Sequence, residues 1–199
     1  MAFINLSCFI ECTEAEGPGK RFALWTQGCM LRCPECCNKE MQPIRPEMIV
    51  STDEIMARIR QAHERYEIEG ITLLGGEPFL QAPGLAQLAR QTRELGMSVM
   101  CFTGYEYSWL KEKCDFDGVA QLLDQIDVLV DGPYVNSRPE TVRNWAGSTN
   151  QRFIYLTDFY SQEIETRKGV ATCEWRIGLD GSITINGFPA DISIETRPE

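Results

Sequence analysis

The 199-residue sequence has few basic residues, a single histidine and no long apolar run. Lys and Arg together number 19 against 29 Asp and Glu, which gives a formal net charge of −10. Because phosphate backbones are bound by basic surfaces, this balance argues against a nucleic acid partner. No stretch approaches the roughly 20 apolar residues of a membrane-spanning helix, so we expect no membrane partner either.

The amino-terminal segment MAFINLSCFIECTEAEG lacks the basic flank and the apolar run of a secretory signal. We therefore expect the protein in the cytoplasm, where disulfides are rare. The nine cysteines are an odd number, and clustered thiols in a reducing compartment are typically metal ligands or redox groups. The length suits one domain with a substantial core.

Strand-like and helix-like apolar patterns alternate along the chain. Strands are predicted at residues 3–11, 21–28, 70–76, 98–104, 127–132 and 152–157, and helices after a capping box at Ser51 and Glu54, at 83–96 and at 119–126. Such alternation predicts an α/β fold in which crossover helices join parallel strands. Near the carboxyl terminus, EWRIGLDGSITINGF predicts a β-hairpin with a two-residue turn at Asp180-Gly181.

Glycines and polar residues follow several of the predicted strands. They are Gly28 and Cys29, Gly75 to Glu77, Thr103 and Gly104, and Asp131 and Gly132. Ligands of parallel α/β folds bind at the carboxyl ends of the strands. These residues therefore predict one composite site at that edge of the sheet.

Four cysteines lie within nine residues in the segment TQGCMLRCPECCNKE. Cys29, Cys33 and Cys36 form a C-x3-C-x2-C loop, and Cys37 follows directly. A structural zinc site needs four ligands, commonly two distant C-x2-C pairs, and the sequence has no second such pair. Three thiolates in one loop suit a [4Fe-4S] cluster that keeps one iron open for a small molecule. Adjacent Cys36 and Cys37 do not easily point at one metal, so we interpret Cys37 as a neighbour.

The sequence resembles the radical S-adenosylmethionine (radical SAM) enzymes in two motifs, Cys29-Met-Leu-Arg-Cys33-Pro-Glu-Cys36 and, further along the chain, Gly75-Gly76-Glu77-Pro78. More closely, it resembles the activating enzymes of anaerobic (class III) ribonucleotide reductases, which are glycyl-radical activases. The further segments that carry this resemblance are Gly17-Pro18-Gly19-Lys20-Arg21, Cys36-Cys37-Asn38, Phe102-Thr103-Gly104-Tyr105, residues 127–132 and residues 145–152. Together they span about residues 15 to 155.

The resemblance implies an open, partial parallel β/α barrel, with a radical SAM core over 1–157 and an extension over 158–199 that carries the hairpin. It implies a [4Fe-4S] cluster on Cys29, Cys33 and Cys36, with no catalytic residue beyond these ligands. SAM would meet Gly75, Gly76, Glu77, Thr103 and Asp131. Reductive cleavage of SAM would give a 5′-deoxyadenosyl radical, which would remove hydrogen from a glycine of a reductase. The implied partners are that reductase and an electron donor such as flavodoxin or ferredoxin.

Two departures from the family pattern stand out. Glu35 occupies the position before the third cysteine, where many radical SAM loops carry an aromatic residue, and the tail from about Asp158 to Glu199 has no counterpart in short activases. Two other functions stay open on the sequence alone. One is a radical SAM enzyme that modifies another peptide or a small molecule, and the other is a non-catalytic zinc or iron–sulfur module.

The remaining candidates have structural interpretations. Asp131 is as well suited to capping a turn as to binding a ligand, and Trp145 suits core packing. Cys101 lies in an apolar strand and is expected to be a buried small hydrophobe. Cysteines without a spacing partner are interpreted as structural: Cys8, Cys12, Cys114 and Cys173.

Overall fold

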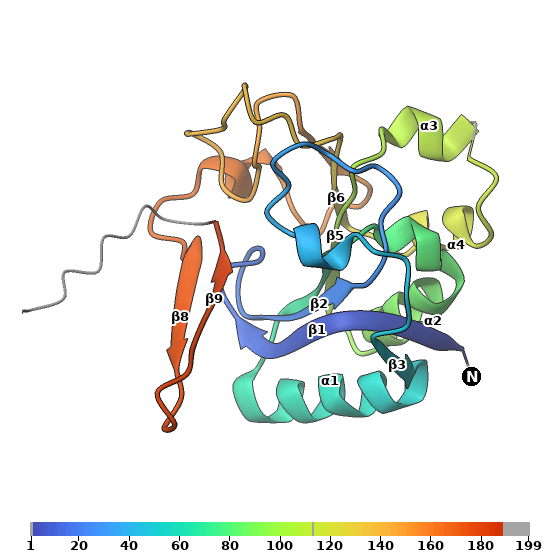
Figure 1. Ribbon diagram of the computed structural model, residues 1–199. Coiled ribbons are helices and arrows are strands. Elements are labelled where there is room, and N and C mark those ends of the chain that lie inside the picture. Colours follow the sequence, from blue (N-terminus) through green and yellow to red (C-terminus); the bar gives the residue numbers. More distant parts are fainter. Residues whose placement is uncertain (1, 113, 189–199) are drawn as a thin grey trace, which may run out of the picture.

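A seven-stranded sheet organises the fold and carries helices on one face (Figure 1). The structure, a computed structural model, describes residues 2–112 and 114–188. Across the sheet the strands run in the order β3-β1-β2-β4-β5-β6-β7. Their bounds are β1 Phe3–Thr13, β2 Arg21–Thr26, β3 Met48–Ser51, β4 Gly70–Gly75, β5 Ser98–Phe102, β6 Val128–Asp131 and β7 Arg152–Tyr155.

The four central strands, β2, β4, β5 and β6, are parallel. The edge strands β3 and β7 do not pair with each other, so the sheet stays open, and the predicted open α/β architecture is confirmed. The expectation of parallel pairing is wrong for β1, which is antiparallel to β2, and for β7, which is antiparallel to β6. No crossover helix precedes β2 or β7, and parallel pairing requires one.

The helices are α1 (Thr52–Tyr66), α2 (Ala82–Glu94), α3 (Tyr107–Glu112) and α4 (Val119–Leu123). The predicted capping box is confirmed, because the Ser51 side chain accepts from the Glu54 N–H and the Glu54 carboxylate accepts from the Ser51 N–H. The short α3 and the four-residue β3 were not predicted.

The two faces of the sheet are covered differently. Apolar side chains from alternate strand positions pack with α1, α2 and α4 into the largest buried cluster, which includes Phe22, Leu73 and Cys101. On the opposite face, Trp25 and Leu74 pack with Met41, which follows the cysteine loop, and Val130 lies in a cluster with Trp145 and Ile164. Helices thus cover one face of the open sheet, and irregular segments cover the other.

The carboxyl-terminal strands β8 (Cys173–Ile177) and β9 (Ile183–Gly187) form a separate antiparallel hairpin, as predicted. The turn differs from the two-residue prediction. Gly178 donates its N–H to Ser182 O, and Gly181 has φ +81°, which makes a three-residue loop with a left-handed glycine. The predicted Asp180-Gly181 pair lies within this longer loop.

The segment between β7 and β8 packs back onto the sheet. Tyr160 reaches the amino-terminal ends of the parallel strands, where its hydroxyl lies 2.7 Å from Ser98 Oγ and accepts from Arg21 Nη1 at 3.0 Å. The division of the chain after residue 157 stays a prediction. Within the described residues, no helix combines the length and apolar character needed to cross a bilayer.

Candidate active site

The cysteine loop follows the carboxyl end of β2 and is fastened by backbone hydrogen bonds. Gly28 and Cys29 donate their N–H groups to Met41 O and Gln42 O at 2.8 and 3.0 Å. These bonds close the loop at its base, because they join its first residues to the segment after its last cysteine. Cys29 is buried, whereas Cys33 and Cys36 are half-buried.

Gly75 and Gly76 lie directly against the start of this loop. Gly76 donates to Thr26 O, and Glu77 donates to Gly28 O at 2.9 Å. A Cβ on Gly76 would lie 2.3 Å from Gly28 O, and one on Gly75, which has φ +106°, would lie 2.5 Å from Thr26 N. Only glycine fits both positions, so the two motifs form one backbone unit.

The Glu77 carboxylate is fully buried beside the two motifs. It accepts hydrogen bonds from Thr103 Oγ1 at 2.9 Å and from the N–H groups of Phe79 and Gly104 at 3.1 and 3.0 Å. Burial raises the pKa of Glu77 to about 7, although these three hydrogen bonds act in the opposite direction. No cationic side chain among the described residues pairs with it.

The Thr103 side chain is hydrogen-bonded directly to the Glu77 carboxylate. Its hydroxyl donates to Glu77 and accepts from the Tyr105 N–H at 3.1 Å. A cavity of about 550 Å³ borders this arrangement through Gly104. The other lining residues are Tyr105, Glu106, Ser108, Trp109, Glu112 and Pro133.

Asp131 lies at the carboxyl end of β6, and its carboxylate is fully engaged within the protein. It accepts from the Tyr107 N–H at the start of α3 and from Arg152 Nε at 2.7 and 2.9 Å. The ion pair follows from the antiparallel register, in which Asp131 lies opposite Arg152. The structure thus joins Thr103 to Glu77 but gives Asp131 a separate set of partners.

Cys36 and Cys37 interact with each other. The Cys37 thiol donates a hydrogen bond that, together with the Asn38 N–H, lowers the pKa of Cys36 to about 6, against the effect of burial. The same pairing raises the pKa of Cys37. The two thiols thus lie in direct contact and lose their protons as a pair.

Asn38 also contacts the candidate site, although it was not among the site residues predicted from the sequence. Its side-chain amide donates to Gly75 O, and its N–H donates to Cys36 Sγ, both at 3.4 Å. It therefore ties the last cysteine of the loop to the glycines after β4. The signal available in the sequence was its position directly after Cys36-Cys37.

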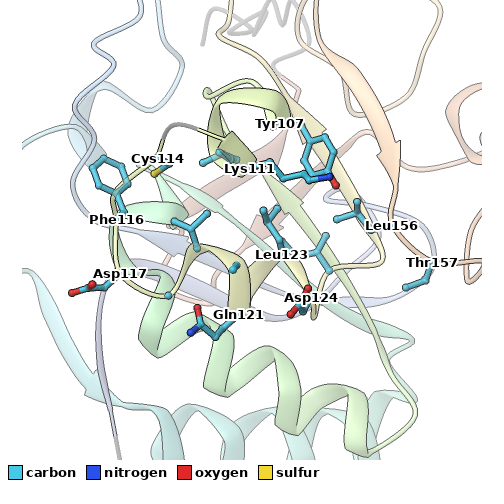
Figure 2. A pocket seen from close by; sticks show the side chains of 15 residues that line it. Tyr107, Lys111, Cys114, Phe116, Asp117, Gln121, Leu123, Asp124, Leu156 and Thr157 are labelled. Carbon is cyan, nitrogen blue, oxygen red and sulfur yellow. The ribbon is translucent and has the colours of Figure 1, made fainter.

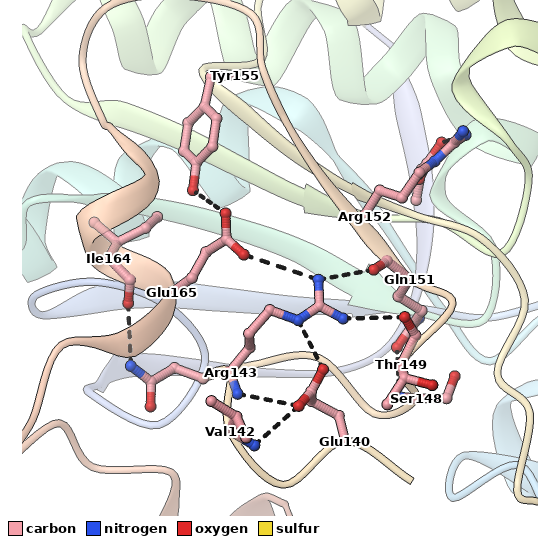
Figure 3. A network of polar contacts seen from close by, with 12 residues as sticks. Glu140, Val142, Arg143, Ser148, Thr149, Gln151, Arg152, Tyr155, Ile164 and Glu165 are labelled. Atoms are coloured by element: carbon pink, nitrogen blue, oxygen red, sulfur yellow. Dashed lines mark hydrogen bonds and ion pairs between the residues drawn. The ribbon is translucent and has the colours of Figure 1, made fainter. Parts of the chain in front are cut away.

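The loop between β6 and β7 is fixed by Arg143 (Figure 3). Its guanidinium donates to Glu140 at 2.7 Å and to Gln151 O at 2.9 Å, and it lies 3.8 Å from Glu165. Hydrogen bonds from the Val142 N–H and from Arg143 lower the pKa of Glu140 to about 2, although burial alone would raise it. Trp145, in the same loop, is buried as expected.

A second cavity of about 730 Å³ lies between α3 and α4 (Figure 2). Its lining includes Tyr107, Lys111, Asp117, Gln121, Asp124 and Leu156. None of the predicted site residues contributes to it. The cavity beside Gly104 is therefore the one that adjoins the candidate site.

Comparison with known proteins agrees with this geometry. The profile of the 4Fe-4S single cluster domain family matches residues 15–154. The anaerobic ribonucleoside-triphosphate reductase-activating protein of Escherichia coli K12 is 31% identical over 160 residues, which are 77% of this chain and 99% of that protein.

The chain belongs to the 4Fe-4S single cluster domain family. The activating protein of the same description from Enterobacteria phage T4 is 27% identical over 159 residues, 78% of this chain and 96% of that protein. The pyruvate formate-lyase-activating enzyme of Staphylococcus epidermidis is 40% identical over 85 residues, 41% of this chain and 34% of that enzyme. The protein is thus a radical SAM enzyme, whose cofactors are a [4Fe-4S] cluster and SAM.

The residues present fit both cofactors of this family. Cys29, Cys33 and Cys36 supply the soft thiolate donors that iron–sulfur clusters require. The buried Glu77 carboxylate lacks a cationic partner in the described part of the chain, and an ammonium group would supply one. Among the described residues no three Cys, His, Asp or Glu side chains already form a metal-binding group. The assignment of the individual ligands stays a prediction.

Proposed function

We propose that this enzyme generates a glycyl radical on an anaerobic ribonucleoside-triphosphate reductase. The observation that carries the proposal is the backbone unit formed by the cysteine loop and by Gly75 to Glu77, with its buried, unneutralised carboxylate. The family membership supports it, because the relatives from Escherichia coli and phage T4 are named as activators of this reductase.

Each part of the site has a definite task in this function. When bound, the reduced cluster and SAM supply a 5′-deoxyadenosyl radical by one-electron cleavage of the sulfur–C5′ bond. Cys29, Cys33 and Cys36 would hold the cluster through their thiolates. The Glu77 carboxylate would bind the amino group of SAM, and the close approach of Gly76 to Gly28 O sets the distance of Glu77 from the cysteine loop.

The supporting residues orient this carboxylate and shape the pocket. Thr103 and the Gly104 N–H fix both Glu77 oxygens, so an incoming ammonium meets a preorganised acceptor. Asp131 orders α3 through the Tyr107 N–H and thereby shapes the cavity beside Gly104. The electron comes from a carrier protein such as flavodoxin or ferredoxin, and the reaction takes place in the cytoplasm.

Deuterium transfer tests the proposal. The reductase is prepared with glycine deuterated at Cα and incubated anaerobically with reduced enzyme and SAM. We expect a glycyl radical in the electron paramagnetic resonance (EPR) spectrum of the reductase and one deuterium in the recovered 5′-deoxyadenosine. Recovery of 5′-deoxyadenosine without deuterium, and without a radical, contradicts the proposed function.

A second candidate function is activation of pyruvate formate-lyase. The 85-residue similarity to the staphylococcal activating enzyme favours testing it. The same experiment with deuterated pyruvate formate-lyase discriminates between them. A radical on the lyase and none on the reductase would transfer the proposed function to the second candidate.

A further inference from the structure

The β8–β9 hairpin has one apolar and one polar face. In its register Trp175 pairs with Ile185, and Ile177 pairs with Ile183. Since directly paired residues share a face of the sheet, these four side chains form one continuous apolar surface, here called the apolar face. Their exposed fractions are 40%, 49%, 75% and 52% for Trp175, Ile185, Ile177 and Ile183 respectively.

The polar face of the hairpin is the one that packs on the protein. Glu174 accepts from Thr13 Oγ1 at 2.8 Å and from the Glu14 N–H at 2.6 Å. Asn186, which is 9% exposed, donates to Thr13 Oγ1 and to Glu16 Oε1, both at 3.0 Å. The hairpin is thus held against the end of β1 by hydrogen bonds, with its apolar face outward.

This orientation is the reverse of the usual one. Hairpins in globular proteins normally bury the apolar face and leave the polar face in water. A two-stranded hairpin has marginal stability by itself, and it requires packing on its apolar face for independent stability. Contiguous exposed apolar side chains rimmed by polar ones mark interaction sites. The anchored polar face therefore leaves the apolar face uncovered by the described residues.

The hairpin lies beyond the part of the chain that carries the cluster chemistry. The family match ends at residue 154, and the Escherichia coli relative is covered over 99% of its own length by 77% of this chain. The hairpin at 173–187 is therefore an addition to the shared activase core. Its surface is available for a task that the core residues do not already perform.

A second copy of the chain is a poor occupant of the apolar face. From the exposed fractions, the four side chains offer roughly 400 Å², about half of what each partner contributes to a stable interface. Two copies with a formal charge of −10 each would also repel one another. A small apolar contact instead suits a complex that must form and dissociate in each activation cycle.

We propose that the apolar face docks the glycyl-radical protein that the enzyme activates. This inference rests on the proposed function. The complementary surface on the partner has an apolar centre with a basic rim, since the chain as a whole carries a formal net charge of −10. The hairpin is anchored at Thr13, beside the start of β2, whereas the cysteine loop follows the end of that strand. Docking at the hairpin therefore tethers a partner that spans this distance to present its glycine loop at the cluster site. It therefore acts on partner binding and not on SAM cleavage.

The test uses the variant Ile177→Lys/Ile183→Glu in the full-length enzyme. The two new side chains lie opposite each other and attract, so the hairpin should keep its fold. The substitutions remove apolar surface and leave the net charge of the chain unchanged. Phe3→Lys/Ile49→Glu is the matched control, because these side chains, on the neighbouring strands β1 and β3, are 65% and 59% exposed. Trp175→Thr is a second hairpin variant that replaces the aromatic side chain with a polar, β-branched one that also favours strands.

We expect the hairpin double variant to need about tenfold more reductase for half-maximal glycyl radical formation. Trp175→Thr should show a smaller increase, and the control should behave like the wild type. Cleavage of SAM without reductase should be unchanged in all three variants. Wild-type reductase dependence in both hairpin variants would overturn the proposal.

Two further outcomes are informative. A wild-type dimer in sedimentation equilibrium that the hairpin variants convert to a monomer would assign the apolar face to a second copy, and would overturn the proposal. A wild-type enzyme that cleaves SAM but forms no radical on the reductase at any concentration would contradict the proposed function, and the docking partner with it. The first result leaves the proposed function intact, so the two failures are distinguishable.

Discussion

The cysteine-loop region and the carboxyl-terminal hairpin are built by opposite means. In the first, backbone groups meet directly, with Glu77 N–H on Gly28 O and no room for a side chain at Gly76. In the second, hairpin side chains make the attachment, notably Glu174 and Asn186. Backbone contact gives a geometry that few substitutions tolerate, whereas side-chain contact allows a module to be added. We therefore expect substitutions in the two regions to separate chemistry from partner binding.

The largest effect is expected at the cluster ligands. Cys33→Ala should lose the iron–sulfur absorbance and all SAM cleavage, because two thiolates do not retain the cluster. Cys37→Ala should keep near wild-type iron and sulfide, since Cys37 lies outside the C-x3-C-x2-C spacing of the three expected ligands. Iron and sulfide analysis after anaerobic reconstitution measures both. Equal losses in the two variants would show that the fourth thiol is a ligand.

Gly76→Ala is expected to reduce SAM cleavage at least 100-fold, since a misplaced binding group costs about that much. The added Cβ would lie 2.3 Å from Gly28 O, and this oxygen is a backbone atom that cannot move away as the end of a flexible side chain can. Gly96→Ala is the matched control, because Gly96 has φ +79° and a Cβ added there would have no other atom within 4 Å. The control should cost stability alone, about 1 kcal/mol, with its rate of SAM cleavage retained.

Thr103→Val should raise the KM for SAM about tenfold, because it removes one charge-assisted hydrogen bond to Glu77. Thr103→Ser keeps the hydroxyl and should restore most of the affinity. A lower kcat at unchanged KM would instead assign Thr103 to a step after SAM binding. Steady-state kinetics of 5′-deoxyadenosine formation distinguish these results.

The affinity for SAM should depend on the protonation of Glu77. The pKa of about 7 means that Glu77 carries its proton below that pH and is ionised above it. An ammonium group binds the ionised form, so SAM affinity should fall as the pH drops below about 7, by about tenfold per pH unit. Isothermal titration at several pH values measures this. Glu77→Gln should bind weakly, with no such slope.

The smallest effect is expected at the hairpin anchor. Asn186→Ala removes the bonds to Thr13 and Glu16 and should destabilise the hairpin by about 1 kcal/mol. Limited proteolysis should then cleave the chain between β7 and β8 sooner than in the wild type. SAM cleavage should be unchanged. A parallel loss of SAM cleavage would show that the hairpin supports the cluster site.

The sequence was informative where local patterns determine the structure. The apolar run of β4 ending in glycines, the capping box at Ser51 and the hairpin all follow from residue order and spacing. Thr103 and Glu77 could be placed at one edge of the sheet, because neighbouring parallel strands end there. Their direct hydrogen bond could not be read from the sequence.

Contacts that depend on tertiary register were less accessible. The Asp131–Arg152 pair requires β7 to run antiparallel to β6, whereas the alternating pattern suggested a parallel strand. The alternation of apolar and polar residues predicts that the hairpin has two different faces. It does not determine which face packs against the rest of the protein, so the outward position of the apolar face was not predictable. The hairpin loop has three residues because Gly181 adopts a left-handed conformation.

The most direct test of the joined site is an EPR titration of the reduced protein with SAM. In the wild type we expect the signal of the reduced [4Fe-4S] cluster to change when SAM is added. In Glu77→Gln we expect the same change only at a much higher SAM concentration. An unchanged wild-type spectrum at saturating SAM, or a protein that takes up zinc without sulfide, would contradict the claim that the cysteine loop and Glu77 form one site.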